Sequence, residues 1–315
     1  MTKEVDVLVI GGGLAGLSAA LTSARLGRST AVLTGGVLGG QLVSIEKIDG
    51  VPGFPDGVPG YDLCPMAQEQ AVAAGAELVA AAADSLETDG ERWQAGSAEG
   101  AFAARAVVLA TGAAIAPLGV PGEERLDGKG VSRCASCDAP LLRGKTAVVI
   151  GGGDSGMQEA LTLAEHVARV VLVERGAALS GQASYRERVQ AHPRIELRFE
   201  TVVTEILGDD AVQGVRIARA DGGGAEELPA DGVFPFPGLV PDTGLVRGLV
   251  ELDAAGRIAV DAALRTTARG LCAAGNVRQG SPHRAAAAMG DGAAAAVALD
   301  RYLATGDWPA RAAGG

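Results

Sequence analysis

Cysteine and histidine are scarce in this chain of 315 residues, which has four cysteines and three histidines. Four cysteines are too few for a small secreted scaffold held together by disulfides. A zinc site needs four ligands, commonly at short spacing, yet the histidines and two of the cysteines, Cys64 and Cys272, lie singly and far apart. We therefore expect no metal site, and we interpret Cys64 and Cys272 as core thiols because apolar residues surround each.

Basic residues and long apolar runs are also in short supply. Lysine and arginine together number 27, against 38 for aspartate and glutamate, which gives a net charge of -11 at pH 7. Nucleic-acid binding requires clustered basic residues, so a nucleic-acid partner is excluded. The longest apolar run, residues 293–299, is far shorter than the ~20 residues of a membrane span. Residues 1–5 show no charged-then-apolar leader, and we expect a cytoplasmic enzyme without a membrane segment.

The most informative stretch that is present is Cys134-Ala135-Ser136-Cys137-Asp138. Two thiols at this spacing can close a reducible disulfide, and thiolate chemistry is accelerated by a nearby cation and a nearby proton donor. Arg133 and Asp138 are placed to supply these. Half of a zinc site is the alternative, but further ligands at suitable spacing are missing. The pattern predicts a two-electron thiol/disulfide centre.

A dinucleotide-binding pattern opens the chain. Residues 5–10 are a β-branched and apolar run suited to a strand buried on both faces, and residues 17–26 predict a helix. Between them, Gly11 allows a tight turn, Gly13 lets the backbone approach a pyrophosphate, and Gly16 allows close helix packing. The next strand, residues 29–33, ends in Thr34-Gly35-Gly36 and lacks the acid that commonly binds an adenosine ribose.

The same pattern recurs after the cysteine pair. Residues 145–150 repeat the strand, Gly151-Gly152-Gly153-Asp154-Ser155-Gly156 repeats the glycine spacing, and residues 157–166 repeat the helix. The following strand, residues 169–173, ends in Glu174-Arg175-Gly176 and does carry the acid. Two Rossmann-type units, one interrupted by the other, imply either two dinucleotide sites or one site and a relic.

The remaining elements are read from periodicity and turn residues. We predict helices at residues 61–74 and 284–303, strands at 77–82 and 106–110, and an alternating segment around 93–103. Antiparallel and edge strands are expected at 195–199, 202–207, 212–219 and 232–236. The last of these contains Pro235, with Pro237 just after it, and proline removes a backbone donor from a strand.

These motifs together resemble the low-molecular-weight, FAD-containing thioredoxin reductases over nearly the whole chain. The resemblance rests on seven segments in the family's order and spacing: GGGLAG at Gly11, GGQL at Gly39, PGFP at Pro52, ATGA at Ala110, GVSRCASCD at Gly130, GGGDSG at Gly151 and AAGNV at Ala273. It implies an α/β fold of two Rossmann-type three-layer domains, the second inserted into the first. Residues 1–116 and 245–315 would bind FAD, residues 117–244 would form the nicotinamide-type domain, and the protein would be a homodimer.

The resemblance also assigns roles to residues. Cys137 would lie against the flavin, Cys134 would attack the substrate disulfide, and Asp138 would shuttle the proton. Flavin contacts are expected at Gly11, Gly13, Leu14, Ala15, Gly16, Gly40, Gln41, Leu42, Ala110, Thr111, Gly112, Gly275, Asn276, Arg284 and Ala285. A nicotinamide nucleotide would contact Gly151, Gly153, Asp154, Ser155, Gly156, Glu174 and Arg175.

Departures from the family concern the electron donor and the partner. NADPH-dependent members have an arginine cluster where this chain has Glu174, Arg175, Gly176 and Ser180. A carboxylate there repels a 2'-phosphate, so we expect NADH rather than NADPH. Asn276 replaces an aspartate, the segment 283–285 reads His-Arg-Ala in place of Tyr-Arg-Gln, and the segment 139–142 replaces a Gly-Phe-Phe platform that helps to receive thioredoxin.

The predicted function is FAD-dependent electron exchange with a dithiol/disulfide substrate, either a thioredoxin-like protein or a small molecule. One alternative needs no nicotinamide, with ferredoxin, a free flavin or a dithiol as donor. Another is a dithiol oxidase of a biosynthetic pathway that uses oxygen, against which Asp138 argues because such relatives tend to have histidine there. A non-enzymatic flavin-binding scaffold is disfavoured by the intact Cys134–Asp138 stretch.

Overall fold

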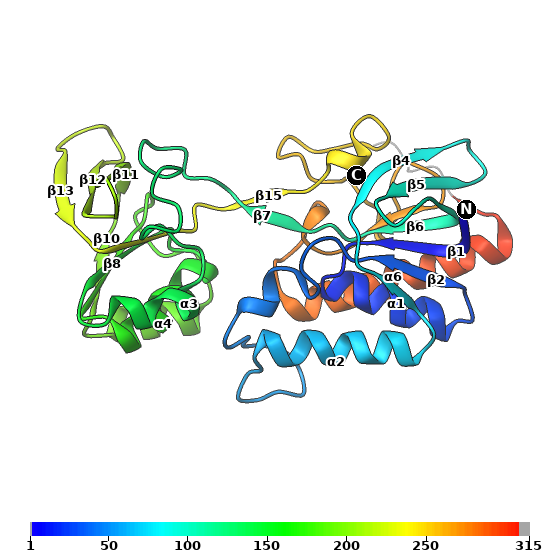
Figure 1. The fold of residues 1–315 in the computed structure, drawn as a ribbon, viewed down its shortest axis with the longest axis horizontal. Helices are drawn as coiled ribbons and strands as arrows, with labels where there is room; N and C mark the ends of the chain where they lie inside the picture. Colours follow the sequence, from blue (N-terminus) through cyan, green and yellow to red (C-terminus); the bar gives the residue numbers. More distant parts are fainter. Residues whose placement is uncertain (1, 309–315) are drawn as a thin grey trace. The chain divides into compact units, whose positions relative to one another are not determined.

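The computed structural model describes residues 2–308, and these residues form two compact units (Figure 1). In the described part, the first unit contains residues 2–114 and 240–308, and the second contains residues 115–239. The expected limits of the inserted segment were 117 and 244, so the observed segment begins two residues earlier and ends five residues earlier. The second unit interrupts the first in the chain, in agreement with the predicted duplication.

The first unit is built on a sheet with the strand order β3-β2-β1-β6-β5-β4. The central strand β1 (Lys3–Ile10) pairs in parallel with β2 (Thr30–Leu33) and β6 (Phe102–Leu109). One edge of β6 is shared, because β5 (Trp93–Ser97) pairs antiparallel with its first half and β16 (Leu271–Ala273) pairs in parallel with its second half. The β1, β2, β6 and β16 strands therefore end at one edge of the sheet. The other strands are β3 (Glu77–Val79) and β4 (Ala83–Thr88).

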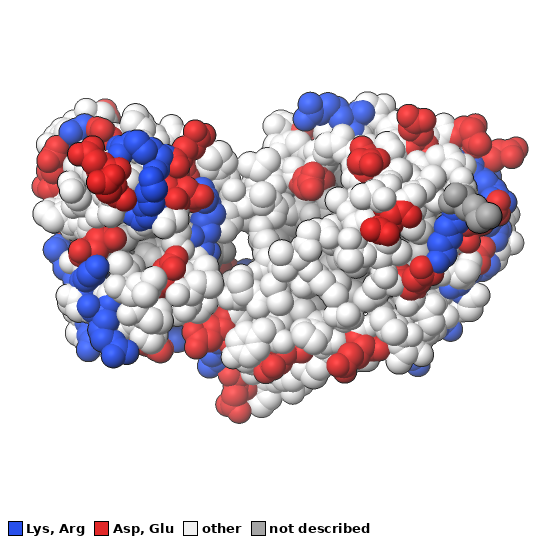
Figure 2. Space-filling view, in the orientation of Figure 1, with Lys and Arg blue, Asp and Glu red and all other residues white. Residues whose placement is uncertain are grey.

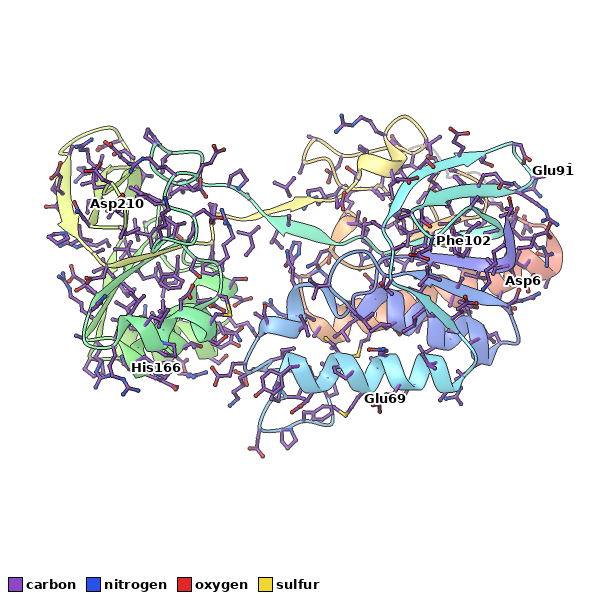
Figure 3. The ribbon with its side chains drawn as sticks, viewed as in Figure 1. Asp6, Glu69, Glu91, Phe102, His166 and Asp210 are labelled. Atoms are coloured by element: carbon purple, nitrogen blue, oxygen red, sulfur yellow. A yellow bond between two sulfur atoms is a disulfide. The ribbon has the colours of Figure 1, made fainter. Side chains whose placement is uncertain are left out.

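The described residues of this unit form three α-helices: α1 (Leu14–Arg25), α2 (Gly60–Ala73) and α6 (Ala285–Thr305). The α1 and α6 helices pack closely, because a Cβ at Gly292 would lie 2.0 Å from the Ala15 carbonyl oxygen. Three short 3-10 helices are η1 (Gly40–Ser44), η3 (Gly244–Val246) and η4 (Gly275–Val277). Phe102, the first residue of β6, is buried in the hydrophobic core of this unit and is labelled in Figure 3.

The second unit has a parallel sheet in the order β10-β9-β8-β14 and an antiparallel sheet in the order β11-β12-β13. The parallel strands are β10 (Ile195–Arg198), β9 (Arg169–Val173), β8 (Thr146–Ile150) and β14 (Gly232–Pro235); the antiparallel strands are β11 (Thr201–Leu207), β12 (Gly214–Arg219) and β13 (Glu226–Pro229). The helices are α3 (Ala135–Asp138), η2 (Ala139–Leu142), α4 (Asp154–His166) and α5 (Ala183–Ala191). Pro235 is accommodated because β14 is an edge strand.

The two units repeat one geometry at their glycine loops. Gly11 has a φ of 118° and Gly151 has a φ of 110°, in the left-handed region that favours glycine. A Cβ at Gly11 would lie 2.2 Å from the Ala110 carbonyl oxygen, and a Cβ at Gly151 would lie 2.2 Å from that of Phe236. The repeat that the sequence predicts is therefore present in the backbone, and the predicted fold class of two Rossmann-type units is confirmed.

Several boundaries and elements differ from expectation. The α1 and α4 helices begin three residues before the predicted starts, directly after their N-cap residues Gly13 and Gly153. The expected strand at 77–82 ends at Val79, and β4 follows it as a separate strand that the sequence did not predict. The α5 helix and the β13 strand were also missed. Among residues 2–308, no helix is long and apolar enough to cross a membrane.

Surface charge agrees with the composition. On the face drawn in Figure 2, acidic and basic side chains of the second unit are interspersed. Arg216 illustrates this, because its guanidinium pairs with both Glu205 and Glu227. Charges paired in this way form a solvated face rather than a basic stripe that could follow a phosphate backbone.

Candidate flavin pocket and redox-active disulfide

A cavity of about 610 Å³ lies in the first unit, at the edge where its parallel strands end. The loops after β1, β2, β6 and β16 supply Gly11, Thr34, Ala110 and Ala274 to its lining. Crevices outside the carboxyl ends of parallel strands are where α/β folds bind dinucleotides. The sheet order thus gathers into one pocket segments as far apart in the chain as Gly11 and Ala274.

The phosphate loop of this pocket fits a pyrophosphate. Gly13 is the N-cap of α1, which has no side-chain cap and no acidic residue in its first turn. A Cβ at Gly13 would find no protein atom within 4 Å, so open space lies beside the loop. Helix N-termini bind anions through unpaired N–H groups and the helix dipole. The α6 helix also begins at the pocket, with Arg284 as its N-cap.

The η4 segment is fixed by a largely buried ion pair. Both carboxylate oxygens of Asp291 accept hydrogen bonds from the Arg278 guanidinium, at 2.6 and 2.7 Å, and one also accepts the backbone N–H of Gly275 at 3.0 Å. Asn276 Oδ1 lies 3.0 Å from the Ser281 hydroxyl and accepts its hydrogen bond. Hydrogen-bonded charge pairs that are largely removed from water hold backbone in one position, so Asp291 fixes the wall formed by Gly275 and Asn276.

The rim of the pocket includes His283, which the sequence analysis treated only as a departure from the family. Its φ is 55°, and it precedes the N-cap residue Arg284. Burial and the neighbouring guanidinium groups of Arg257 and Arg284 lower the pKa of His283 below its ordinary value. The imidazole is therefore neutral at neutral pH.

Fourteen of the fifteen residues predicted for the flavin line this cavity, and Gly16 does not. Gly16 instead allows α1 to approach β1, because its Cβ would lie 1.9 Å from the Gly11 carbonyl oxygen. Sequence reasoning missed some lining residues that tertiary structure brings in, namely Gly36, Val37, Asp242, Leu245 and Ala288. Among these residues only Gly36 belongs to a stretch that the sequence had singled out, Thr34-Gly35-Gly36, and that stretch was noted only because it lacks an acid.

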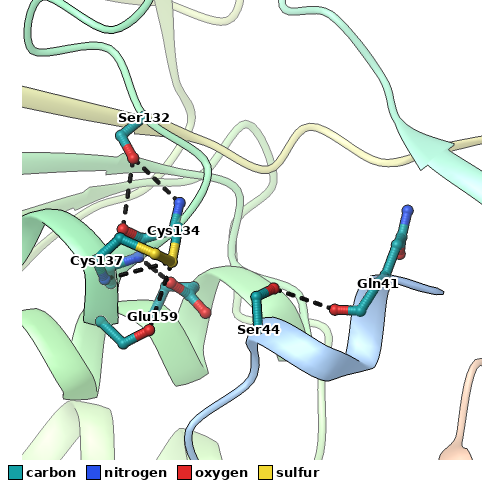
Figure 4. Close-up of a disulfide and its surroundings, with 8 residues drawn as sticks. Gln41, Ser44, Ser132, Cys134, Cys137 and Glu159 are labelled. Carbon is teal, nitrogen blue, oxygen red and sulfur yellow. Dashed lines mark hydrogen bonds between the residues drawn. A yellow bond between two sulfur atoms is a disulfide. The ribbon is translucent and has the colours of Figure 1, made fainter. Parts of the chain in front are cut away.

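The cysteine pair lies in the second unit and is closed as a disulfide (Figure 4). Cys134 is the N-cap of α3, and its Sγ accepts the backbone N–H of Cys137 at 3.3 Å. The Ser136 hydroxyl lies 3.4 Å from the same sulfur. Hydrogen-bond donors near a cysteine sulfur stabilise its thiolate, and the Cys137 N–H is such a donor to Cys134.

Two neighbours of the disulfide were predicted to assist it. Asp138 is half-buried, and its carboxylate makes no hydrogen bond or ion pair with other residues in the described part of the chain. It is thus available to carry a proton. Arg133 does not match its prediction, because its guanidinium pairs with Glu123 and Asp127, each at 3.0 Å. Glu123 is buried and also accepts the backbone N–H of Gly119, so Arg133 anchors the loop rather than serving the thiolate.

The second glycine loop carries Glu174 against it. The carboxylate accepts the backbone N–H of Gly152 at 2.6 Å and that of Gly176 at 2.6 Å. Gly153, the N-cap of α4, has only the Ser180 hydroxyl, at 3.9 Å, near the position of an added Cβ. Asp154 Oδ1 accepts the backbone N–H of Gln182 at 2.7 Å, which folds the segment after β9 over the loop.

The free thiols Cys64 and Cys272 are buried as predicted, and burial raises the pKa of both.

A dinucleotide pocket in one unit and a disulfide on a second dinucleotide-type unit define a flavoprotein disulfide oxidoreductase. The sequence profile of the pyridine nucleotide-disulphide oxidoreductase family matches residues 5–292. The chain belongs to this family, as a thioredoxin reductase-like member. The predicted resemblance is confirmed.

Individual relatives match along almost the whole chain. It is 37% identical to the thioredoxin reductase of Treponema pallidum over 97% of this chain and 99% of that protein. It is 38% identical to the thioredoxin reductase of Mycolicibacterium smegmatis, over 96% and 97% of the two chains. The crystal structure of Lactococcus lactis thioredoxin reductase superposes with a TM-score of 0.92 at 33% identity, over 95% of this chain and 99% of that one.

Proposed function

We propose that this protein takes electrons from NADH and passes them through FAD and the Cys134–Cys137 pair to a disulfide substrate. The first unit would hold FAD and the second would hold the nicotinamide nucleotide. The observation that carries the choice of donor is Glu174, held at the end of β9 beside the phosphate loop. The dinucleotide rule places the ribose-binding acid at the end of the second strand.

The two sulfurs divide the work. When bound, FAD accepts a hydride and delivers an electron pair to a disulfide. Cys137, which is exposed, receives that pair, and Cys134 is released as a thiolate at the N-terminus of α3. Cys134 then attacks the substrate disulfide to form a mixed disulfide, which Cys137 resolves. The hydrogen bonds to Cys134 Sγ support this assignment.

Asp138 moves the proton in this scheme. Reduction of a disulfide to two thiols consumes two electrons and two protons, and the thiolate leaving the mixed disulfide must be protonated. The Asp138 carboxyl is the neighbouring group without a partner among the described residues, so it can donate that proton and take it back.

Charge distinguishes NADH from NADPH at the adenosine ribose. The carboxylate of Glu174 can accept hydrogen bonds from the 2'- and 3'-hydroxyls of NADH while it keeps its backbone donors. A 2'-phosphate would instead place two negative groups together. Arg175 is the one arginine of the family's cluster that this chain retains, because Gly176 and Ser180 occupy the other places.

The substrate is proposed to be a thioredoxin-like protein, because the relatives named above are thioredoxin reductases. The surface beside the cysteines supports a protein contact: Leu141 in η2 is 74% exposed. A small-molecule disulfide is the other candidate substrate. We also propose that the protein is a homodimer in the cytoplasm, which light scattering and fractionation test.

A second candidate is a nicotinamide-independent enzyme, with ferredoxin as donor or with oxygen as acceptor for a dithiol oxidase. The observation in its favour is the pair Pro235 and Pro237, which removes two backbone donors at and just after the end of β14. Phe236 between them still donates to the Ile150 carbonyl at 2.8 Å, so one ladder bond remains. Glu174 would then be a structural ligand of the loop in a relic domain.

The test is anaerobic reduction of the holoprotein. Flavin absorbance is followed after mixing with NADH, NADPH, or reduced ferredoxin, and oxygen uptake is followed after adding a dithiol in air. Rapid bleaching by NADH is the expected result. Rapid bleaching by NADPH contradicts the choice of nucleotide, and bleaching by ferredoxin alone supports the second candidate. Reduction of oxidised thioredoxin by the NADH-reduced protein tests the substrate.

A further inference from the structure

A buried carboxylate lies under the redox-active helix. Glu159 belongs to α4 and is 9% exposed, and its Oε2 accepts the backbone N–H of Ala135 at 2.7 Å. Ala135 directly follows Cys134 and is the first residue of α3. Figure 4 shows Glu159 next to the cysteine pair. The sequence analysis did not identify this residue, because helical periodicity does not reveal that α3 covers it.

Two backbone N–H groups of α3 have different acceptors, one at Glu159 and one at Cys134. The N–H of Ala135 goes to Glu159, and the N–H of Cys137 goes to Cys134 Sγ. Covalent geometry puts Cys134 Sγ within about 5 Å of the Ala135 nitrogen, so the Glu159 oxygen lies within about 8 Å of that sulfur. At this separation, two negative groups in a partly buried site disfavour one another by an amount comparable to a tenfold change in an equilibrium constant.

We propose that Glu159 is a positioning residue that also keeps the Cys134–Cys137 pair strongly reducing. The disulfide is neutral, whereas its reduction by two electrons with uptake of one proton gives a thiol at Cys137 and a thiolate at Cys134. A fixed carboxylate disfavours that thiolate without affecting the disulfide, so it lowers the reduction potential of the pair. A pair that must pass electrons outward to a substrate gains driving force from this.

The hydrogen bond to Ala135 supplies the positioning. It fixes the first residue of α3, and with it the N-cap geometry that directs the Cys137 N–H to Cys134 Sγ. The inference deepens the proposed function and rests on it only for the direction of electron flow. The reduction equilibrium itself is measured without any nicotinamide nucleotide or protein substrate, so a failure of the proposed donor leaves this test unaffected.

The experiment equilibrates the holoprotein anaerobically with dithiothreitol buffers and quantifies free thiols by alkylation and mass. Cys64 and Cys272 are buried, so Cys134 and Cys137 account for the labelling of the native protein. Glu159→Gln keeps an oxygen acceptor for Ala135 and removes the charge. We expect the equilibrium to shift about tenfold toward the dithiol, which is about 30 mV. The pH profile of Cys134 alkylation should move to lower pH.

Matched variants separate charge from structure. Glu159→Ala provides a second removal of the charge if the glutamine variant fails to retain FAD, and Glu159→Asp keeps the charge. Glu165→Gln changes an exposed acid on the same helix and should leave the equilibrium as in wild type. The proposal is overturned if Glu159→Gln matches wild type in both the equilibrium and the pH profile, or if the aspartate variant shifts as far as the glutamine variant.

Discussion

The carboxylate of Glu174 accepts the backbone N–H of Gly152 across 2.6 Å, which ties the end of β9 to the phosphate loop of the second unit. This contact places a negative charge where the adenosine ribose of a dinucleotide is bound in Rossmann folds. It orients the acid without using all of its lone pairs, so hydroxyl donors can still be accepted. In the proposed function, ribose recognition would therefore depend on the same side chain that holds the loop.

Replacing Glu174 should weaken the binding of NADH more than that of NADPH. Glu174→Gln should raise the KM for NADH about 10- to 100-fold, because hydrogen bonds to a charged group are worth about 1.5–3 kcal/mol. Steady-state kinetics with NADH and NADPH measure the effect, and Glu187→Gln, an exposed acid on α5, is the control. An unchanged KM in Glu174→Gln would assign the carboxylate to loop structure alone.

The two N-cap glycines offer a matched pair of changes. Gly13 and Gly153 have φ of -77° and -80°, which alanine adopts, and an added Cβ meets open space at Gly13 and only the Ser180 hydroxyl at 3.9 Å at Gly153. Gly13→Ala should fold but lose about 10²-fold in FAD affinity, because the methyl group holds the phosphates away from two N–H donors. Gly153→Ala should keep FAD and lower the affinity for NADH by a similar factor. Flavin content and NADH titration distinguish the two; full FAD binding by Gly13→Ala would exclude this loop as the pyrophosphate site.

The two cysteine-to-serine variants should differ in the reactivity of the remaining thiol. Cys137→Ser should abolish turnover while Cys134 remains open to alkylation, because the attacking thiol persists but has no electron source. Cys134→Ser should also abolish turnover. Mass spectrometry after iodoacetamide treatment, with a thioredoxin assay alongside, measures both properties. Residual turnover in Cys137→Ser above that of the buffer would show that Cys137 is not the sulfur that receives electrons.

Asp138 should affect the rate without affecting the cofactor. Asp138→Asn should retain FAD and lower kcat about 10²-fold or more, the range for losing a general acid or base. Glu124→Gln, an exposed acid nearby in the same unit, is the control. Substrate turnover at several pH values gives the measurement, and a wild-type rate in Asp138→Asn removes this carboxyl from the proton path.

Acid stability of the first unit should depend on Asp6. Burial alone raises the pKa of this carboxyl, but hydrogen bonds from Arg105 and Ser29 outweigh it and lower the pKa below its ordinary value. A lowered folded-state pKa adds stability above the unfolded-state pKa, and the gain is lost as the pH falls through the folded-state value. Asp6→Asn should therefore cost about 1 kcal/mol at pH 7 and almost nothing at pH 2, by urea unfolding. An equal loss in the free energy of unfolding at pH 7 and at pH 2 would contradict an ionic origin of this stabilisation.

Local patterns account for most of what could be predicted. Glycine spacing and the apolar runs around it gave the two loops, the strands before them and the cysteine centre, because each depends on residues adjacent in sequence. The α5 helix was missed because it buries only Tyr185 and Val189, which is too little apolar periodicity to detect. The β13 strand buries only Leu228.

The remaining features depend on distant parts of the chain. Asp242 reaches the flavin pocket because the chain returns to the first unit after β15, where its N–H donates to the Gly112 carbonyl, and His283 reaches it just before α6. Arg133 was expected to serve the cysteines because it is adjacent in sequence, but Glu123 and Asp127 bind its guanidinium. Sequence adjacency shows that Arg133 lies near the cysteines, but it does not show which carboxylate its flexible side chain will pair with.

The inserted segment begins and ends at nearly the same place. Within the second unit the Ala116 N–H donates to the Gly238 carbonyl at 2.9 Å, and within the first unit the Asp242 N–H donates to the Gly112 carbonyl at 3.0 Å. The intervening strands β7 (Ala113–Ile115) and β15 (Leu239–Pro241) pair as a two-stranded ladder. Coincident ends make each unit separable by a short splice, so a gene could gain, lose or exchange the disulfide-bearing module without a new long connection in its host.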